Sequence, residues 1–417
     1  MAKRSARTLD AAIDEVVRSG NCSGCGACTQ LDAGIRMELS EEGFARPRRV
    51  AGTATAAAVD RFDAACPGRR MPAARPASAI RHPTMGPVVA AWAASAADRD
   101  IRHRGSSGGA ITALTAWLLE QGEAASVVGA RADPVEPRRT VSLTLQTREE
   151  ALASAGSRYA PTSNAAVRGA LDPAAAVVGK PCEVSAIRSL TTDGPAPLLI
   201  SFFCAGTPGQ QATDALVEQL GIPRHAPLRE LWYRGRGWPG RFTAVSLEGT
   251  EVSASYDESW GAHLGPATQW RCKLCPDGVG EQSDITAADF WNSDERGYPV
   301  FDEQDGVSAL IARTRRGADV IARAITAGVL DARPLAIGDL AAVQPLQVRR
   351  RTLLLGRMLG ARLAGRPTPR YPGFGLLRLA LAHPIETLRT ARGTRTRVLR
   401  ERAARAAASP SREVTRT

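Results

Sequence analysis

Lysine is almost absent from this 417-residue sequence, which contains three lysines and 51 arginines. Such a bias usually reflects genome composition, yet two of the three lysines lie beside cysteines. Lys180 precedes Cys182 by two positions, and Lys273 lies between Cys272 and Cys275. Either chance explains this placement, or the site requires a compact ammonium group that a planar guanidinium would not replace.

Long apolar runs are also missing. No uninterrupted run reaches the 18 residues that indicate a membrane-spanning helix. The basic N-terminus, MAKRSARTLDAAIDE, has no apolar segment behind it and does not resemble a secretory signal. We therefore expect a cytoplasmic protein, in whose reducing surroundings thiols stay free or bind metal. The five histidines lack metal-ligand spacing, and no Ser-His-Asp arrangement stands out.

Positive charge is unevenly distributed. The formal net charge is +12, but the residues from Val348 onward contain seventeen arginines and three acidic residues, so the first 347 residues carry a net charge of about −2. A basic tail is able to contact an acidic partner, anionic lipid or nucleic acid. A solvated, disordered tail is the simpler interpretation. We expect no nucleic-acid partner, because the tail has no aromatic residues interleaved for stacking on bases.

Composition divides the chain into four segments. The first segment, residues 1–72, is rich in Cys, Gly and Pro from residue 21 onward, which is typical of a segment that folds around a cofactor. A Pro- and Ala-rich linker follows at 73–87, then a domain at 88–347, and then an Arg-rich helical or disordered tail at 348–417. A chain of this length is able to bury a sizeable core.

Hydrophobic periodicity predicts the fold class. A short helix is expected within residues 1–20. Strands are predicted at 88–93, 126–131, 141–147, 174–182, 197–204 and 306–317. Helices are predicted within 105–122 and at 211–220 and 318–327. This alternation favours an α/β domain with a largely parallel or mixed sheet.

Three of the eight cysteines, Cys22, Cys25 and Cys28, are separated by two-residue gaps, and Cys66 precedes a proline. Each gap lets the chain curl around a 4Fe–4S cluster, and the remote Cys66 supplies the fourth ligand. Zinc or free structural thiols are the alternatives, but zinc sites usually use two separated ligand pairs. Residues 1–72 are therefore predicted to be a ferredoxin-like iron–sulfur segment.

The other four cysteines are Cys182 and Cys204, at the ends of two predicted strands, and Cys272 and Cys275, in a C-x2-C loop. Strand ends converge at one edge of an α/β sheet, where ligands bind, so the four thiolates are able to meet there. We favour a second 4Fe–4S cluster. A zinc site, or inert buried thiols at Cys182 and Cys204, are the alternatives.

Two loops are candidates for binding an organic cofactor. Backbone amides at a helix N-terminus bind anions, so a glycine-rich turn before the helix within 105–122, together with Thr112, is a candidate phosphate site. This turn consists of Gly105, Ser106, Ser107, Gly108 and Gly109. It is not a Walker loop. In the loop YRGRGWPG (233–240), Arg234 and Trp238 are able to form a stacking wall for a flat ligand. Ordinary turns are the alternative for both loops.

Ten segments resemble, in order, those of the coenzyme F-420 (F420) hydrogenase/dehydrogenase beta-subunit family. That family also includes the 7-hydroxymethyl chlorophyll a reductases and a ferredoxin-dependent divinyl chlorophyllide reductase. The similarity covers about residues 20–345. The segments are CSGCGACTQ (22–30), GSSGGAITAL (105–114), VVGAR (127–131), GSRYAPT (156–162), VGKPCEVSAIRSL (178–190), ISFFCAGTPGQQAT (200–213), YRGRGWPG (233–240), SWGAHLG (259–265), RCKLCPDGVGEQSDITAADFW (271–291) and GVSALIARTRRG (306–317).

The resemblance implies FAD bound by the α/β domain, with a 4Fe–4S cluster beside it held by Cys182, Cys204, Cys272 and Cys275. Within the matching segments, Lys180 and Arg158 are the candidate catalytic residues, with Lys180 as a cation that stabilises reduced flavin, and Tyr159 is a candidate flavin-binding residue. Glu183 departs from the glutamine expected after the Pro-Cys pair, which alters the local charge.

The predicted function is that of an oxidoreductase that passes electrons between a two-electron carrier or organic substrate, through FAD, and two 4Fe–4S clusters. Ferredoxin or reduced F420 would be the electron partner. The alternative is an electron-transfer subunit that docks to a hydrogenase or dehydrogenase and has no substrate of its own. A third class is a non-catalytic interaction protein that holds zinc. The sequence does not identify the organic substrate.

Overall fold

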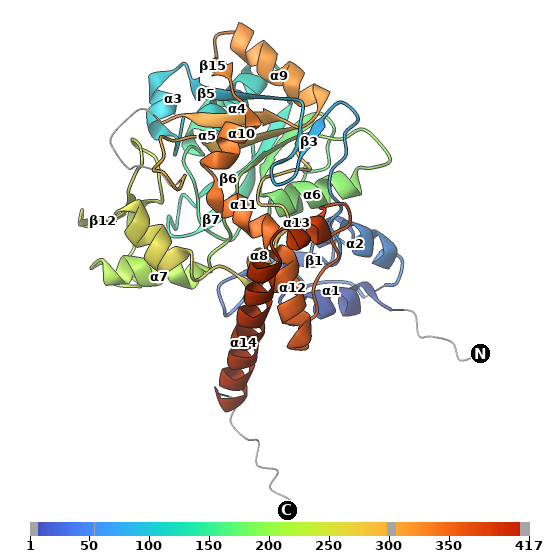
Figure 1. Ribbon diagram of the computed structural model, residues 1–417. Helices are drawn as coiled ribbons and strands as arrows, with labels where there is room; N and C mark the ends of the chain where they lie inside the picture. The colour runs from blue at the N-terminus through green and yellow to red at the C-terminus, as the bar shows by residue number, and fades with distance from the viewer. Residues whose placement is uncertain (1–6, 54, 298–305, 409–417) are drawn as a thin grey trace, which may run out of the picture.

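The computed structural model describes residues 7–53, 55–297 and 306–408 and contains a mixed eight-stranded sheet (Figure 1). Its strands, from one edge to the other, are β15 (Leu330–Pro334), β5 (Ala90–Ala96), β14 (Ser308–Ala312), β13 (Ile285–Asp289), β9 (Leu198–Phe202), β8 (Ala175–Gly179), β6 (Ser126–Ala132) and β7 (Thr140–Leu145). The four strands from β13 to β6 run parallel, and the outer pairs are antiparallel. The predicted α/β class with a mixed sheet is confirmed.

Helices cover both faces of this sheet. One face packs against α3 (Arg99–Arg104), α4 (Ala110–Glu120) and α9 (Arg315–Thr326), and α5 (Arg148–Ala153) lies against α4. The other face packs against α6 (Pro181–Leu190) and α10 (Ile337–Ala342). Successive strand residues point to opposite faces. Ile200 of β9 therefore lies in the first core, and its neighbour Leu199 lies in the second.

Most of the predicted elements are present, with one informative difference. The strand predicted at 174–182 ends at Gly179, and Cys182 lies in the first turn of α6. Pro181 takes the first helical position, where its missing N–H costs nothing, and the Glu183 carboxylate accepts a 2.7 Å hydrogen bond from the Lys180 amide at the start of the helix. Helix α6 therefore begins within the stretch that apolar character alone assigned to a strand.

The N-terminal segment contains α1 (Leu9–Arg18), η1 (Ala27–Gln30), β1 (Ile35–Leu39), β2 (Ala45–Arg49) and α2 (Val59–Ala65). The Thr8 hydroxyl accepts a hydrogen bond from the Ala11 amide and caps α1. The small core of the segment contains Ile13, Val16 and Phe62. The predicted linker at 73–87 contains most of a hairpin made of β3 (Ile80–His82) and β4 (Gly86–Val88).

A smaller subdomain, not predicted from the sequence, lies beside the main sheet (Figure 1). It consists of β10 (Leu228–Trp232), β11 (Phe242–Ser246), β12 (Glu251–Ala254), α7 (Gln210–Gln219) and the π-helical η3 (Asp257–Leu264). Two further short helical elements are η2 (Asn164–Ala166) and α8 (Trp270–Lys273). Tyr233 and Phe242 lie in the core of the smaller subdomain.

The basic tail up to residue 408 is mostly helical, with an irregular stretch at 364–375. It forms α11 (Pro345–Thr352), α12 (Leu354–Leu363), α13 (Leu376–Ala382) and α14 (Pro384–Ala408). Figure 1 shows α14 running beside α12 away from the sheet. A side chain at Gly356 or Gly360 would clash with the carbonyl oxygen of Thr387 or Ala391, so these glycines permit the close approach of the two helices.

Candidate functional site

Four cysteines converge in the N-terminal segment. Cys22, Cys25 and Cys28 lie in and beside the turn after α1, and Cys66 ends α2. All four line one small cavity beneath the apolar side chains of α1 and α2. Gly26 has a φ of 90°, a left-handed conformation that favours glycine and turns the chain between the second and third cysteine. The spacing therefore brings the four thiols together as predicted.

Burial and mutual proximity disfavour the charged form of the outer thiols. Burial raises the pKa of Cys25 to about 11, with a further contribution from Cys22. Burial and the neighbouring cysteines also raise the pKa of Cys28 and of Cys66. Four buried thiolates without a counter-charge would repel one another, and a cationic iron–sulfur core is a group that offsets this repulsion.

The other four cysteines form a second, inner group. Cys204 follows β9, and both Cys272, in α8, and Cys275 lie close enough to add to the burial effect that raises the pKa of Cys204 to about 12. Burial raises the pKa of Cys182 well above its usual value, and Cys25 and Cys204 raise it further. Cys182 therefore lies near a cysteine of the outer group and a cysteine of the inner group. Cys204 therefore lies near Cys272 and Cys275, and Cys182 lies near Cys204, while the meeting of all four thiols at one point stays a prediction.

The nearness of the thiols does not by itself establish a metal site. Among the residues that the structure describes, no group of three or more Cys, His, Asp or Glu side chains is arranged to hold a metal ion. In a 4Fe–4S cluster each cysteine binds a different iron, so the four ligands surround the cluster. The prediction therefore requires four thiols arranged around a cavity. The assignment of clusters to the eight cysteines stays a prediction.

A cavity of about 750 Å³ lies at the carboxyl ends of the parallel strands, and Cys204 forms part of its wall. Its size is that of cavities that hold drug-sized ligands or cofactors. The predicted flavin residues that line it are Gly105, Ser106, Ser107, Gly109, Thr112, Tyr159, Arg234 and Trp238, and the wall also includes Lys180 and Arg158. Residues that are far apart in the sequence are therefore brought to one cavity.

Gly108 does not line this cavity. Its amide donates a hydrogen bond of 3.1 Å to the Ser308 hydroxyl, and a side chain there would lie 2.6 Å from the Ala94 carbonyl oxygen. Gly108 therefore lets the turn pack against the sheet. The Ser106 hydroxyl accepts a 2.6 Å hydrogen bond from the Ser157 amide. The Ser106 hydroxyl therefore holds the glycine-rich turn against the loop that contains Ser157.

Arg234 connects the two predicted cofactor loops. Its guanidinium pairs with Asp289 at the end of β13 at 2.7 Å and donates to the Ser106 carbonyl. It also lies over the rings of Trp238 and Tyr256 at 5.0 and 5.1 Å. This buried cation therefore fixes an aromatic wall against the glycine-rich turn.

Three buried polar atoms in the cavity wall have no hydrogen-bond partner among the described residues. They are Nε1 of Trp238, a donor, and the amide oxygens of Asn164 and Gln347, which are acceptors. Buried polar groups in folded proteins almost always have partners. A ligand with both donors and acceptors fits this wall, and an isoalloxazine ring is such a ligand. Sequence reasoning missed Asn164 and Gln347, because neither lies in a recognisable motif.

Lys180 is not an isolated cation. Its ammonium lies 3.1 Å from Glu183 and donates a 2.9 Å hydrogen bond to the Thr162 carbonyl. Burial alone would lower the pKa of Lys180, but the Glu183 carboxylate outweighs it and the pKa is raised. The glutamate found in place of the expected glutamine therefore offsets the positive charge beside the cavity.

Arg158 has mainly structural contacts. Its guanidinium donates to the carbonyls of Leu231, Pro137 and Arg139 and to the Thr140 hydroxyl, at 2.7–3.0 Å. These bonds engage the guanidinium with the protein itself. The contacts favour a role in holding the β6–β7 turn against β10 over the direct role in flavin chemistry predicted from the sequence.

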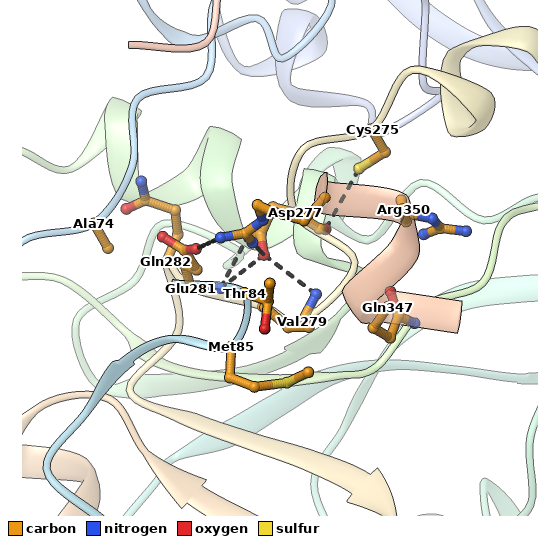
Figure 2. Close-up of polar contacts among 12 residues, drawn as sticks. Ala74, Thr84, Met85, Cys275, Asp277, Val279, Glu281, Gln282, Gln347 and Arg350 are labelled. Carbon is orange, nitrogen blue, oxygen red and sulfur yellow. Dashed lines mark hydrogen bonds and ion pairs between the residues drawn. The ribbon is translucent and has the colours of Figure 1, made fainter. Parts of the chain in front are cut away.

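The loop that carries Cys272 and Cys275 rests on a buried charge network (Figure 2). Cys275 Sγ contacts the Asp277 backbone oxygen at 3.4 Å, and the Asp277 carboxylate accepts a hydrogen bond from the Glu281 amide at 3.0 Å. Both contacts are drawn as dashed lines in Figure 2. The Glu281 carboxylate pairs with Arg81 at 2.9 Å and with Arg351 of α11. Charges from three separate segments therefore hold the loop in place.

Two arginines that the sequence did not single out lie against the inner group. Arg350 of α11 donates a 2.6 Å hydrogen bond to the Cys204 carbonyl. Arg271, which is 1% exposed, donates from Nη2 to the Pro67 carbonyl at 2.9 Å, beside Cys66. Its Nε and Nη1 have no partner in the part of the chain that the structure describes. In a sequence this rich in arginine, nothing distinguishes them from surface residues.

The fold and the site define a class: an α/β protein with a cofactor-sized cavity at its parallel strand ends and a group of buried thiols in the cavity wall. Two family models match this chain, and both describe the beta subunit of coenzyme F420 hydrogenase/dehydrogenase. The model of its N-terminal part matches residues 91–168, and the model of its C-terminal part matches residues 173–337. Together they span more than half of the sequence. The chain belongs to the coenzyme F420 hydrogenase/dehydrogenase beta-subunit family.

Individual relatives agree with this assignment. The coenzyme F420 hydrogenase subunit beta of Methanothermobacter thermautotrophicus is 26% identical over 258 residues, which are 58% of this chain and 83% of that protein. The protein of the same name from Methanosarcina barkeri is 23% identical over 276 residues, with coverages of 61% and 85%.

A chain of the F420-reducing [NiFe] hydrogenase complex from M. barkeri has a similar fold. The TM-score is 0.51 at 19% identity, over 68% of this chain and 97% of that one. Within the described residues, no helix is both long enough and apolar enough to span a bilayer.

Proposed function

We propose that this protein is a flavin-dependent iron–sulfur oxidoreductase that passes electrons between a two-electron carrier or organic substrate and two 4Fe–4S clusters. One observation carries the proposal: Cys204 of the inner thiol group forms part of the wall of the cavity that also contains the glycine-rich turn. The inner group in turn adjoins the outer group through Cys182 and Cys25. The nearness of Cys182 to a thiol of each group supports electron transfer between the cavity and the outer thiols.

The cavity wall supplies the contacts that FAD needs. The amides at the start of α4 would hold a phosphate, with Thr112 nearby. Trp238 Nε1 and the amide oxygens of Asn164 and Gln347 would meet the polar edge of the ring. Bound flavin would exchange electrons in pairs with a hydride carrier and singly with iron–sulfur clusters. The Lys180–Glu183 pair would place a nearly neutral charge pair beside the ring.

The eight cysteines would hold the clusters. Cys22, Cys25, Cys28 and Cys66 would bind the outer cluster, and Cys182, Cys204, Cys272 and Cys275 would bind the inner one. The buried thiols, whose pKa values are raised by burial and by one another, would be deprotonated on binding the cationic iron core. Reduced F420 is the favoured two-electron carrier because the relatives are named for it, and a ferredoxin-like protein is the favoured one-electron partner.

Anaerobic purification with iron, sulfide and flavin quantitation tests this proposal. We expect about eight iron atoms, about eight sulfides and one FAD per chain. Cys22→Ala should remove about half of the iron and leave flavin bound, whereas Cys204→Ala should remove the other half and perturb the flavin spectrum. A colourless protein that contains zinc after anaerobic purification would contradict the proposal.

A second candidate function is that of an electron-transfer subunit without a substrate of its own. The relatives favour it, because they are named as subunits of hydrogenases. Reduced F420 with methyl viologen as a one-electron acceptor distinguishes the two. Turnover by the isolated chain supports the self-sufficient enzyme, and turnover that appears only after a partner subunit is added supports the second candidate.

A further inference from the structure

The C-terminal helices expose large aliphatic side chains. Leu377 and Leu381 of α13 are 65% and 70% exposed, and Ile385 and Leu388 at the start of α14 are 64% and 66% exposed. Single exposed aliphatic residues are ordinary, but four within twelve positions form a concentrated apolar surface. Such a surface usually contacts something else.

These side chains are not misplaced core residues. Leu376 and Ala380 of α13 are buried, and Thr387 and Ala391 of α14 are buried as well. The two helices therefore already bury one side against the protein. The spacing of three or four residues places Leu377 with Leu381, and Ile385 with Leu388, on the remaining exposed side of each helix.

Positive charge surrounds this aliphatic surface. Arg378, Arg389 and Arg392 are exposed among or beside the four residues, and Glu386 is the acidic residue between them. The sequence from Val348 onward carries seventeen arginines and three acidic residues. A second copy of the chain would bring two strongly basic surfaces together. An acidic protein would neutralise the arginines without requiring four exposed aliphatic side chains. An anionic bilayer accounts for both features.

We propose that α13 and the first turns of α14 bind the surface of an anionic lipid bilayer. The aliphatic side chains enter the acyl boundary, and the arginines contact the lipid headgroups. The buried side of α13 packs in the cluster that contains Leu274 and Tyr371, and the Tyr371 hydroxyl donates a 2.7 Å hydrogen bond to the Leu274 carbonyl. The Cys272–Cys275 loop therefore lies directly behind the bilayer-binding surface. This inference does not depend on the proposed redox function.

Vesicle sedimentation with the full-length protein tests the inference. We expect binding to vesicles of equal parts phosphatidylglycerol and phosphatidylcholine, at least about tenfold stronger than to pure phosphatidylcholine, and weaker as salt is raised. The double variant Leu377→Ser/Leu381→Ser should bind at least about tenfold more weakly. The matched control is Leu247→Ser, because Leu247 is 59% exposed but lies between β11 and β12. It should bind like the wild type.

A second variant keeps the test independent of the aliphatic substitutions. Arg378→Gln/Arg389→Gln should weaken binding to the anionic vesicles by about fivefold for each arginine and leave binding to neutral vesicles unchanged. Absent binding to anionic vesicles, or equal binding by the wild type and both variants, would overturn the inference. So would self-association in sedimentation velocity without lipid that the leucine substitutions abolish, since a second copy would then be the occupant.

Discussion

Single buried arginines set the charge around the inner thiol group. Burial alone would lower the pKa of Arg271, but Tyr371 and the nearby cysteines raise it. The guanidinium lies over the Tyr371 ring at 5.5 Å and has two N–H-bearing nitrogens without partners among the described residues. A buried cation with free donors beside thiolates stabilises added negative charge.

Replacing Arg271 should change the reduction potential of the proposed inner cluster. Arg271→Met removes a buried charge and its donors, so the potential should fall by about 60–120 mV, the equivalent of one charged hydrogen bond. Redox titration followed by electron paramagnetic resonance measures it. Lys273→Gln is the control, because Lys273 is exposed in the same loop and its charge is screened by solvent. An equal shift of the reduction potential in both variants would contradict a specific role for Arg271 and indicate a general effect of positive charge.

The unpartnered donor of Trp238 makes a separate prediction about flavin affinity. Trp238→Phe keeps an aromatic ring in the cavity wall and removes Nε1, so FAD should bind about three- to tenfold more weakly. Fluorescence titration of the flavin-free protein measures the affinity. Trp232→Phe serves as the control, since Trp232 lies in β10 and contacts Arg236 instead of the cavity. Unchanged affinity in the Trp238 variant would exclude this contact.

At the scale of elements, the Glu281 carboxylate joins three segments that are distant in sequence. It binds Arg81 of β3 and Arg351 of α11, while its own loop carries two of the inner cysteines, Cys272 and Cys275. Burial raises the pKa of Glu281, but Arg351 and Arg81 outweigh burial and leave it below its usual 4.5. The stabilisation is therefore complete above about pH 4.5 and is lost as the pH falls through the lowered pKa.

Neutralising Glu281 should be costly. Glu281→Gln removes the carboxylate shared by the buried Arg351 and the half-buried Arg81 and should reduce the free energy of unfolding by about 3–5 kcal/mol at pH 7, measured by urea denaturation. The difference from the wild type should shrink at low pH, where the wild-type carboxylate also loses its charge. Glu230→Gln is the matched control, since Glu230 pairs with Arg236 while 48% exposed. It should change stability by less than about 1 kcal/mol.

Elements with strong periodicity were predictable, and elements that depend on distant partners were not. Helix α4 and strands β8 and β9 follow from local pattern, and the place of Cys204 follows from the end of a strand, whereas Cys182 lies in α6 and not at a strand end. Strands β10–β12 and the helices of the tail have weak local signals, since their burial is set by Tyr233, Phe374 and other distant contacts. The orphaned amides of Asn164 and Gln347 are visible only once the cavity is assembled.

At the scale of the whole molecule, the N-terminal segment has a small core of its own and shares it with the outer thiols. Cys22, Cys28 and Cys66 pack against Ile13 and Phe62. A segment with so few buried side chains would depend on the proposed outer cluster for stability. The core between the eight-stranded sheet and helices α4 and α9 is larger and contains none of the cysteine side chains.

Loss of the outer cluster should therefore loosen the N-terminal segment selectively. In Cys22→Ser, or after anaerobic chelation of the wild type, hydrogen exchange in residues 7–72 should accelerate by about tenfold or more, with little change in β8 and β9. Mass spectrometry of peptides measures both regions in one experiment. Uniform acceleration across the chain would contradict an independent role for the cluster in this segment.

The change in composition near residue 348 does not mark a place where the protein can be cut. Arg350 and Arg351 lie beyond it, yet one holds the Cys204 carbonyl and the other neutralises Glu281. A gene shortened at that point would encode every cysteine and every residue of the cavity wall. Its product would still lack Arg350 and Arg351, which support Cys204 and the loop that carries Cys272 and Cys275. A loss of activity after such a deletion would therefore be wrongly attributed to catalytic residues in the tail.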